Sequence, residues 1–169
     1  MFVLGVDPGL SRCGYGVVEP RGRRARAVAV GVIRTDPSAS TPHRLAALQE
    51  ELRALIAAHR PAVVAVERVF FQVNAQTAIA VAQASGIAQA EAARAGCEVV
   101  EYTPNQVKEA VGGWGGAEKA SVGRMVASLL GLERPPVPAD AADAAAVALC
   151  HLAHAPLRAR AARAGSRVR

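Results

Sequence analysis

Cysteine and aromatic residues are scarce in this sequence of 169 residues, and no long apolar run occurs in it. Its three cysteines form no CxxC pair, which argues against a disulfide scaffold and against a zinc ribbon. No apolar run reaches the roughly 18 residues of a membrane span, and the first residues lack the basic segment of a signal peptide. These absences predict a protein of the reducing cytoplasm.

Lysine is also scarce, and the basic charge is concentrated near the C-terminus. Of the 20 basic residues, only Lys108 and Lys119 are lysines, and the others are arginines. These two positions are therefore candidates for a role that needs a compact, mobile ammonium group. Residues 151–169 carry five arginines and no acid, whereas the rest of the chain is almost neutral. We expect residues 156–169 to form a basic, flexible tail, which either contacts a polyanion such as nucleic acid or only keeps the protein soluble.

What is present suffices for one folded domain, which we assign to residues 1–155. Hydrophobic residues make up 51% of the chain and charged residues 20%. Apolar runs and helical periodicity predict an α/β domain with a five-stranded mixed sheet that begins with an antiparallel meander. Thr41 is the predicted N-cap of the first helix. The predicted strands are 2–6, 14–19, 27–35, 62–66 and 97–102, and the predicted helices are 42–60, 74–95, 104–111, 117–130 and 139–155.

Two of the predicted strands are continuous apolar runs that end in an acid. Residues 2–6 are followed by Asp7, and residues 62–66 are followed by Glu67. Such runs are typical of central strands covered on both faces, and the helix between them allows a parallel crossover. Asp7 and Glu67 would then meet at the carboxyl edge of the sheet, where open α/β folds place their sites. The alternative is that each acid only begins a solvated loop.

A second pair of acids opens the last predicted helix. Asp140 and Asp143 are three residues apart, so they share one face of the helix. They would also suit a helix cap and the helix dipole. The rest of this helix is apolar apart from His151 and His154, so it packs against the protein on most of its surface. Its two acids are therefore expected to point at something specific.

Four clustered carboxylates need a counter-charge. Two unit charges about 4 Å apart repel by about 4 kcal/mol at an effective dielectric of 20. Ligands that are all oxygen suit Mg²⁺ or Mn²⁺ better than Zn²⁺. An acidic metal site in a basic chain predicts two-metal cleavage of phosphodiester bonds.

Six short motifs occur in a fixed order along residues 1 to about 155. They are Gly5-Val6-Asp7-Pro8-Gly9, Gly14-Tyr15-Gly16, Val66-Glu67-Arg68-Val69-Phe70, Pro104-Asn105-Gln106-Val107-Lys108, Ala117-Glu118-Lys119 and Ala139-Asp140-Ala141-Ala142-Asp143-Ala144. Asp-Pro-Gly alone is shared by related folds, but the ordered set is specific. In this set the chain resembles the RuvC family of bacterial Holliday-junction resolvases.

The resemblance implies a ribonuclease H-like fold, with helices flanking the sheet, and a homodimer that cuts two symmetry-related strands of a four-way DNA junction during recombination and repair. It implies 5′-phosphate and 3′-hydroxyl products, two Mg²⁺ ions per site (with Mn²⁺ as a substitute) and a place in the bacterial nucleoid. Junction-binding and branch-migration proteins are its implied partners. It assigns the acidic metal site to Asp7, Glu67, Asp140 and Asp143, and it places Lys108 and the catalytic Lys119 near the scissile phosphate.

The segment after Glu67 is the expected contact with DNA bases. Phe70 is assigned by its family position to stacking on unpaired bases, which is worth about 1–3 kcal/mol per base. Phe71 is a second candidate, with core packing as its alternative. Arg68, in the same motif, is assigned to DNA binding with them.

Three further features each have two possible interpretations. The small residues of the helix 74–95 (Ala78, Ala82, Gly86, Ala88 and Ala92) form either a dimer surface or a packing face within the monomer. Trp114 is either a DNA wedge or docked on its own domain. His151 and His154 are either functional ligands or satisfied core residues, and the cysteines are expected to be buried small hydrophobes.

Three other classes of protein share parts of the pattern. An actin-like ATPase has a similar first strand but needs two domains, and a related nuclease would act on RNA. A non-catalytic nucleic-acid-binding module would gain nothing from four acids facing phosphates. ATP turnover, cleavage of structured RNA, or DNA binding without cleavage would identify each of these.

Overall fold

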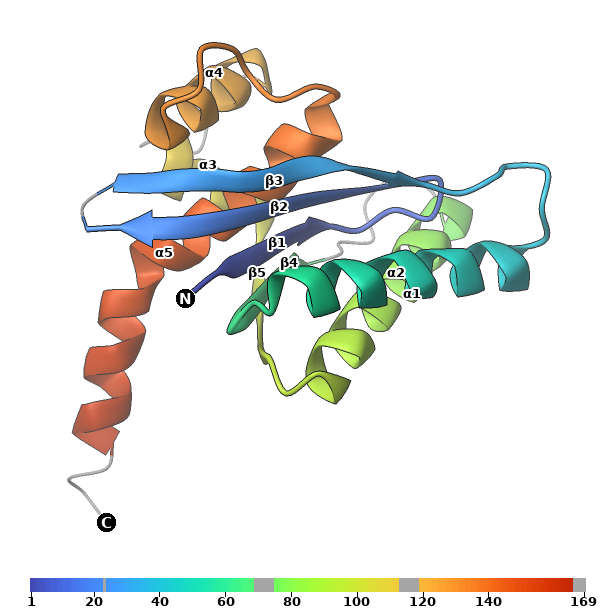
Figure 1. Ribbon diagram of the computed structural model, residues 1–169, viewed down its shortest axis with the longest axis horizontal. Helices are drawn as coiled ribbons and strands as arrows, with labels where there is room; N and C mark the ends of the chain where they lie inside the picture. The colour runs from blue at the N-terminus through green and yellow to red at the C-terminus, as the bar shows by residue number, and fades with distance from the viewer. Residues whose placement is uncertain (23, 69–74, 113–118, 166–169) are drawn as a thin grey trace.

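A computed structural model describes residues 1–22, 24–68, 75–112 and 119–165 (Figure 1). Within these ranges, the side chains of residues 75–76, 119–121 and 157–165 are outside the description. No helix in the described part of the chain is long and apolar enough to cross a membrane. The strands are β1 Val3–Asp7, β2 Arg12–Arg21, β3 Arg24–Arg34, β4 Val63–Glu67 and β5 Glu98–Tyr102, and the helices are α1 Thr41–His59, α2 Ala75–Arg94, α3 Pro104–Gly112, α4 Lys119–Leu130 and α5 Ala139–Gly165.

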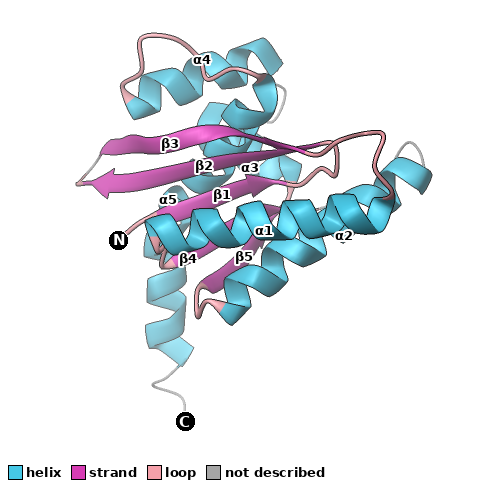
Figure 2. Cartoon of the chain, turned by 45° about the vertical axis from the view of Figure 1, so that its right-hand side comes forward, coloured by secondary structure: helices cyan, strands magenta, loops and turns pink. Residues whose placement is uncertain are grey.

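The five strands form one mixed sheet in the order β3-β2-β1-β4-β5. β1, β2 and β3 pair antiparallel, which confirms the predicted meander. β4 lies parallel to β1 and β5 lies parallel to β4, so α1 and α2 are crossover connections. This is the predicted five-stranded mixed sheet, and β1 and β4 are its central neighbours (Figure 2).

Helices cover both faces of the sheet, which explains why β1 and β4 are continuously apolar. Val3 of β1 packs in one core with Val147 of α5 and residues of α3 and α4, and Leu4 packs in a second core with Leu48 of α1 and Ala88 of α2. Adjacent residues of a strand point to opposite faces, so every position of these two strands has a helix to pack against. Figure 1 shows α1 and α2 on one side of the sheet and α3, α4 and α5 on the other.

Glycines in β1 and β2 let α5 lie directly on the sheet. A Cβ atom on Gly16 would lie 2.7 Å from the Cα of Ala145, and a Cβ on Gly5 or Gly14 would collide with the carbonyl oxygen of Ala144 or Asp140. Real Cβ atoms do not approach other atoms this closely, so the glycines are needed for the backbone of α5 to rest on these strands. The contact fixes where the first turn of α5 sits.

The start of α1 and the end of α5 differ from the predictions. The N-cap of α1 is Ser40 and not Thr41, and its hydroxyl pairs with the ring of His43 instead of capping a backbone N–H. α5 does not end at Ala155 but continues through Pro156 to Gly165. The residues beyond Pro156 are mostly alanine and arginine, which are strong helix formers, so the helix resumes after the proline. The division into a domain and a flexible tail stays a prediction.

Candidate active site

Asp7 and Glu67 end two neighbouring parallel strands at the same edge of the sheet. Val6 of β1 pairs with Val66 of β4 in the parallel register, so the two acids follow side by side. Val6 and Val66 belong to the core that faces α1 and α2. Because side chains alternate along a strand, Asp7 and Glu67 point to the opposite face, toward α5, where both are half-buried.

The first turn of α5 brings Asp140 to the same place. Gly14 of β2 pairs with Asp7 in the sheet, and the backbone of Asp140 lies directly over Gly14. Asp7 and Asp140 line one cleft of about 480 Å³. Asp143 is half-buried and shares the face of α5 that carries Asp140, since residues three apart are neighbours on a helix. The strand register and the position of α5 thus bring Asp7 and Asp140 to one cleft, whereas Glu67 and Asp143 are not among the residues that line it. The assignment of all four acids to one site stays a prediction.

Two arginines that the sequence analysis missed also line this cleft. Arg12, the first residue of β2, places its Nε 3.4 Å from an oxygen of Asp140. Arg44 of α1 donates hydrogen bonds to the hydroxyls of Thr35 (2.9 Å) and Ser11 (2.6 Å). Neither arginine lies in a motif or an apolar pattern, so only the pairing of β1 with β2 and the crossing of α1 reveal them.

The segment that connects Asp7 to Arg12 is held by a small hydrogen-bond network. The buried hydroxyl of Thr35 donates to the carbonyl oxygen of Leu10 at 2.6 Å, and the backbone N–H of Thr35 donates to the carbonyl of Ser11 at 3.4 Å. Arg44 binds the same two residues, Thr35 and Ser11, through their side chains. The loop after Asp7 is therefore tied to β3 and to α1, which fixes the direction of the Asp7 strand end.

The donor chemistry of this edge fits a divalent metal, although the side chains do not form a closed ligand group. Among the residues that the structure describes, no three His, Cys, Asp or Glu side chains are grouped so as to hold a metal ion. Asp140 has Arg12 as a cationic neighbour instead. The four candidate ligands are all carboxylates on one side of the sheet, and carboxylate oxygens are the donors that Mg²⁺ and Mn²⁺ prefer.

The other predicted site residues are placed only in part. Arg68 follows β4, where its backbone N–H donates to the carbonyl of Tyr102 at 2.8 Å and its exposed guanidinium lies 4.0 Å from Glu101. Lys108 is half-buried on α3 and is not among the residues that line the cleft. Lys119 begins α4, but its side chain is outside the description. Phe70, Phe71 and Trp114 lie outside the described residues.

The histidines of α5 have hydrogen-bond partners within the fold, which agrees with the interpretation that they are core residues. His151 is only 3% exposed, and its Nδ1 is hydrogen-bonded to the hydroxyl of Tyr102 at 3.1 Å. The Nδ1 of His154 lies 2.9 Å from the carbonyl of Cys150. Cys13 and Cys150 are buried as predicted, whereas Cys97 is only half-buried, so the prediction is wrong for Cys97. Burial raises the pKa of the Cys13 and Cys150 thiols to about 12, so both are neutral small hydrophobes.

The small residues of α2 serve two different faces. Ala78, Ala88 and Ala92 are buried within the monomer, so the prediction that all five small residues form one dimer surface is wrong for these three. Ala82 and Gly86 are exposed, on the face that also carries Ile79. The sequence alone could not separate the two faces, because alanine suits both a close helix contact and a core.

Comparisons with known proteins identify the family and the fold of this chain. The family model described as "Crossover junction endodeoxyribonuclease RuvC" matches residues 3–151. A protein of that name from Salinispora arenicola is 54% identical over 170 residues, covering 100% of this chain and 97% of its own length. The structure of Thermus thermophilus RuvC matches with a TM-score of 0.85 at 38% identity, covering 93% of this chain and 96% of the other.

A second Thermus thermophilus structure matches equally well and contains DNA. It is RuvC in complex with Holliday junction substrate, with a TM-score of 0.85, 35% identity, and coverage of 93% of this chain and 96% of the other. The match confirms the ribonuclease H-like fold that the resemblance implied. With a family model over most of its length and a relative that is about half identical from end to end, the chain belongs to the RuvC family.

Proposed function

We propose that this chain is a crossover junction endodeoxyribonuclease, which resolves Holliday junctions by metal-dependent, paired and symmetric hydrolysis of phosphodiester bonds in recombination and DNA repair. The observation that carries the proposal is the match to the RuvC family over residues 3–151. Two features of the fold support it: Asp7 and Asp140 line one cleft, and Glu67 ends the strand beside Asp7. The related nuclease and the binding-only module named above lack this combination of acids and family match.

Asp7, Glu67, Asp140 and Asp143 are the residues that would hold two Mg²⁺ ions, or Mn²⁺ in their place. When bound, such ions lower the pKa of an attacking water and offset the charge on the leaving oxygen, which gives 5′-phosphate and 3′-hydroxyl ends. Asp7 is central in this set, because β1 lies between β2, which supports Asp140, and β4, which ends in Glu67. We therefore infer that Asp7 would be the central ligand of this metal site.

Lys119 and Lys108 are the proposed cationic contacts to the scissile phosphate. Their helices, α4 and α3, pack through Val122 and Val107 in the core on the α5 side of the sheet, which is the side of the four acids. An ammonium group there would offset charge that develops on the phosphate during the reaction. Lys119 is the proposed catalytic lysine, and Lys108 is proposed to bind DNA beside it.

Arg68, Phe70 and Phe71 are the proposed contacts to the junction crossover. Residue 68 directly follows Glu67, so the chain leaves the sheet at the proposed catalytic edge. Arg68 is exposed and available to a phosphate. Phe70 is the proposed stacking residue, with Phe71 as a second contact that would otherwise pack in the core.

A homodimer would supply the two symmetric cuts. Two strands of a junction are cut in pairs only if two sites are related by a two-fold axis, and a two-fold dimer presents the same surface on both copies. Ile79, Ala82 and Gly86 form an exposed apolar stripe on α2, and small residues allow two helices to approach closely. We propose this face as the dimer contact, and junction-binding and branch-migration proteins as further partners in the cytoplasm.

The proposal is tested with a synthetic four-way DNA junction and a linear duplex of matching sequence. Each is incubated with the protein in Mg²⁺ and in EDTA, and the products are separated on a denaturing gel. We expect paired, symmetric nicks in the junction only, and only with the metal. Tight binding without cleavage in any divalent ion would instead identify a non-catalytic module, and cleavage of structured RNA alone would identify the other nuclease class.

A further inference from the structure

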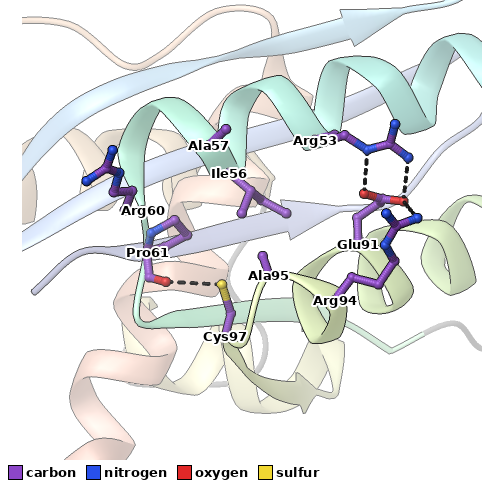
Figure 3. Close-up of a pocket in the computed structure, with 9 residues that line it drawn as sticks. All are labelled: Arg53, Ile56, Ala57, Arg60, Pro61, Glu91, Arg94, Ala95 and Cys97. Carbon is purple, nitrogen blue, oxygen red and sulfur yellow. Dashed lines mark hydrogen bonds and ion pairs between the residues drawn. The ribbon is translucent and has the colours of Figure 1, made fainter.

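A second concave surface lies at the end of the sheet opposite the four acids. It is formed where α1 leads through Pro61 into β4, and where α2 leads through Cys97 into β5 (Figure 3). β4 begins at this end and finishes with Glu67 at the other, so the length of a strand separates the two sites. The cavity has a volume of about 570 Å³, which is in the size range of ligand-binding pockets.

The floor of this cavity is apolar. Ile56, Ala57, Pro61 and Ala95 line it, and Figure 3 shows Ile56 pointing from α1 toward Ala95 at the end of α2. The thiol of Cys97 donates to the carbonyl oxygen of Pro61 at 3.1 Å, which ties the start of β5 to the turn before β4. An apolar floor favours an apolar group of a ligand over water.

Arg53 and Arg94 form one rim of the cavity, held by Glu91. Arg53 donates two hydrogen bonds of 3.0 Å to the carboxylate of Glu91, and Gln49 donates a third of 2.6 Å. Arg94 is 3.8 Å from the same carboxylate and 70% exposed, so most of its donors face solvent. Glu91 itself is only 4% exposed, and it therefore fixes a cationic edge without shielding it from a ligand.

Arg60 forms the other rim. Its backbone has a left-handed φ of 46°, and its N–H donates to the carbonyl of Ile56 at 2.8 Å to close the end of α1. The cavity thus has three guanidinium groups and one carboxylate, and cations flank the floor on two sides. The helix dipole explains why single arginines occur at the ends of α1 and α2, but it does not explain their arrangement around an apolar floor.

We propose that the arginine pocket, defined by Arg53, Arg60, Arg94, Ile56 and Pro61, binds an acidic segment of a partner protein. An apolar side chain of that segment lies on the floor, and carboxylates on either side of it pair with Arg60 and Arg94. Arginine forks match carboxylates in a bidentate manner, and interfaces between proteins combine an apolar centre with a polar rim in this way.

The shape of the pocket favours a peptide over a DNA arm. Phosphates of a duplex lie on a convex surface and gain nothing from an apolar floor, whereas a peptide side chain fills it. The inference stands on this pocket alone and does not depend on the nuclease function.

Fluorescence anisotropy with labelled peptides and the full-length protein tests the proposal. The probe is Asp-Glu-Leu-Leu-Glu-Asp, and its controls are Asn-Gln-Leu-Leu-Gln-Asn, which lacks the charges, and Asp-Glu-Ala-Ala-Glu-Asp, which lacks the apolar anchor. We expect the probe to bind more tightly than either control. The variant Arg60→Glu/Arg94→Glu should weaken its binding about tenfold or more, because each lost charge-assisted hydrogen bond is worth roughly that factor.

Two further variants separate the pocket from overall charge. Arg24→Glu/Arg134→Glu changes the net charge equally at exposed positions outside the pocket and should leave peptide binding nearly unchanged. Ala57→Gln fills the floor without a charge change and should weaken binding. Equal binding of all three peptides, or equal losses in the two double variants, would overturn the proposal. Loss of junction binding in Arg60→Glu/Arg94→Glu would assign the pocket to DNA and overturn it as well.

Discussion

The guanidinium Nε of Arg12 lies 3.4 Å from a carboxylate oxygen of Asp140, although the two residues belong to different ends of the chain. The contact exists because α5 begins directly above Gly14, two residues after Arg12 in β2. Arg12 is therefore a cationic neighbour of one of the four candidate metal ligands. The pair is exposed enough that it adds little to stability, so its effect is expected on the site and not on the fold.

Substitution Arg12→Ala should strengthen metal binding at the edge of the sheet where Asp7 and Asp140 lie. The variant removes a cation that competes with the metal for Asp140. We therefore expect half-saturation at a lower Mn²⁺ concentration than in the wild type, with binding measured as the rise in melting temperature on addition of Mn²⁺. The melting temperature without metal should change little, since exposed ion pairs contribute at most about 1 kcal/mol. Arg34→Ala is the matched control, because Arg34 pairs with Arg12 in the sheet and is exposed. Equal Mn²⁺ affinity in both variants would contradict the prediction.

Substitution Asp7→Asn should abolish junction cleavage while leaving junction binding intact. The amide keeps the size of the side chain but removes the charge of the proposed central ligand. We expect cleavage to fall by more than about 100-fold, because even indirect partners of a metal are worth 10- to 100-fold. The control Glu51→Gln, at an exposed position of α1, should cut at the native rate. Native cleavage by Asp7→Asn, measured in single turnover, would show that the site is assigned wrongly.

Substitution Gly16→Ala should destabilise the protein and also displace Asp140 from the cleft that it shares with Asp7. The new Cβ would lie 2.7 Å from the Cα of Ala145, so α5 must move off the sheet. Overpacking of this kind typically costs about 1–3 kcal/mol. Gly123→Ala is the control, since its Cβ would lie 3.4 Å from Pro135, an ordinary contact. A native melting temperature for Gly16→Ala would rule out close packing of α5 on β2.

Substitution Glu91→Gln should lower stability at neutral pH but not in strong acid. Hydrogen bonds from Arg53 and then Gln49 lower the pKa of Glu91 from its ordinary value of 4.5 to about 2. The stabilisation is therefore complete above pH 4.5 and is lost as the pH falls toward 2. The difference in melting temperature between wild type and variant should shrink across that range. A difference that stays constant from pH 7 to pH 2.5 would contradict this account.

Substitution Ile79→Glu should convert the proposed dimer to monomers. Ile79 is 54% exposed. In a two-fold contact, the two introduced carboxylates would repel each other, and both would lose their hydration in the interface. Sedimentation velocity should show the smaller species, and junction cuts should become single and unpaired. Ala54→Glu, at an exposed position of α1, adds the same charge outside the stripe and should stay dimeric. If both variants sediment as wild type, the dimer contact lies elsewhere.

The order of the elements and the identity of the candidate ligands were determined by the sequence itself. Continuous apolar runs predicted β1 and β4 as central strands, and the acids that end them predicted the catalytic edge. These features are local: the period of the pattern, a proline or glycine at an element end, and an acid at a strand end depend on near neighbours in the chain. The ordered motifs likewise identified the family before the fold was known.

Only the tertiary structure decided which side chains meet across distant elements. The crossing of α5 over Gly14 placed Arg12 beside Asp140, and the packing of α1 on α2 placed Arg53 on Glu91. The packing of α2 also buries Ala88 and Ala92 in the core and leaves Gly86 exposed. A run of small residues in the sequence does not determine which of them are buried. Such contacts depend on strand order and helix crossing, which are set by the whole core and not by any one segment.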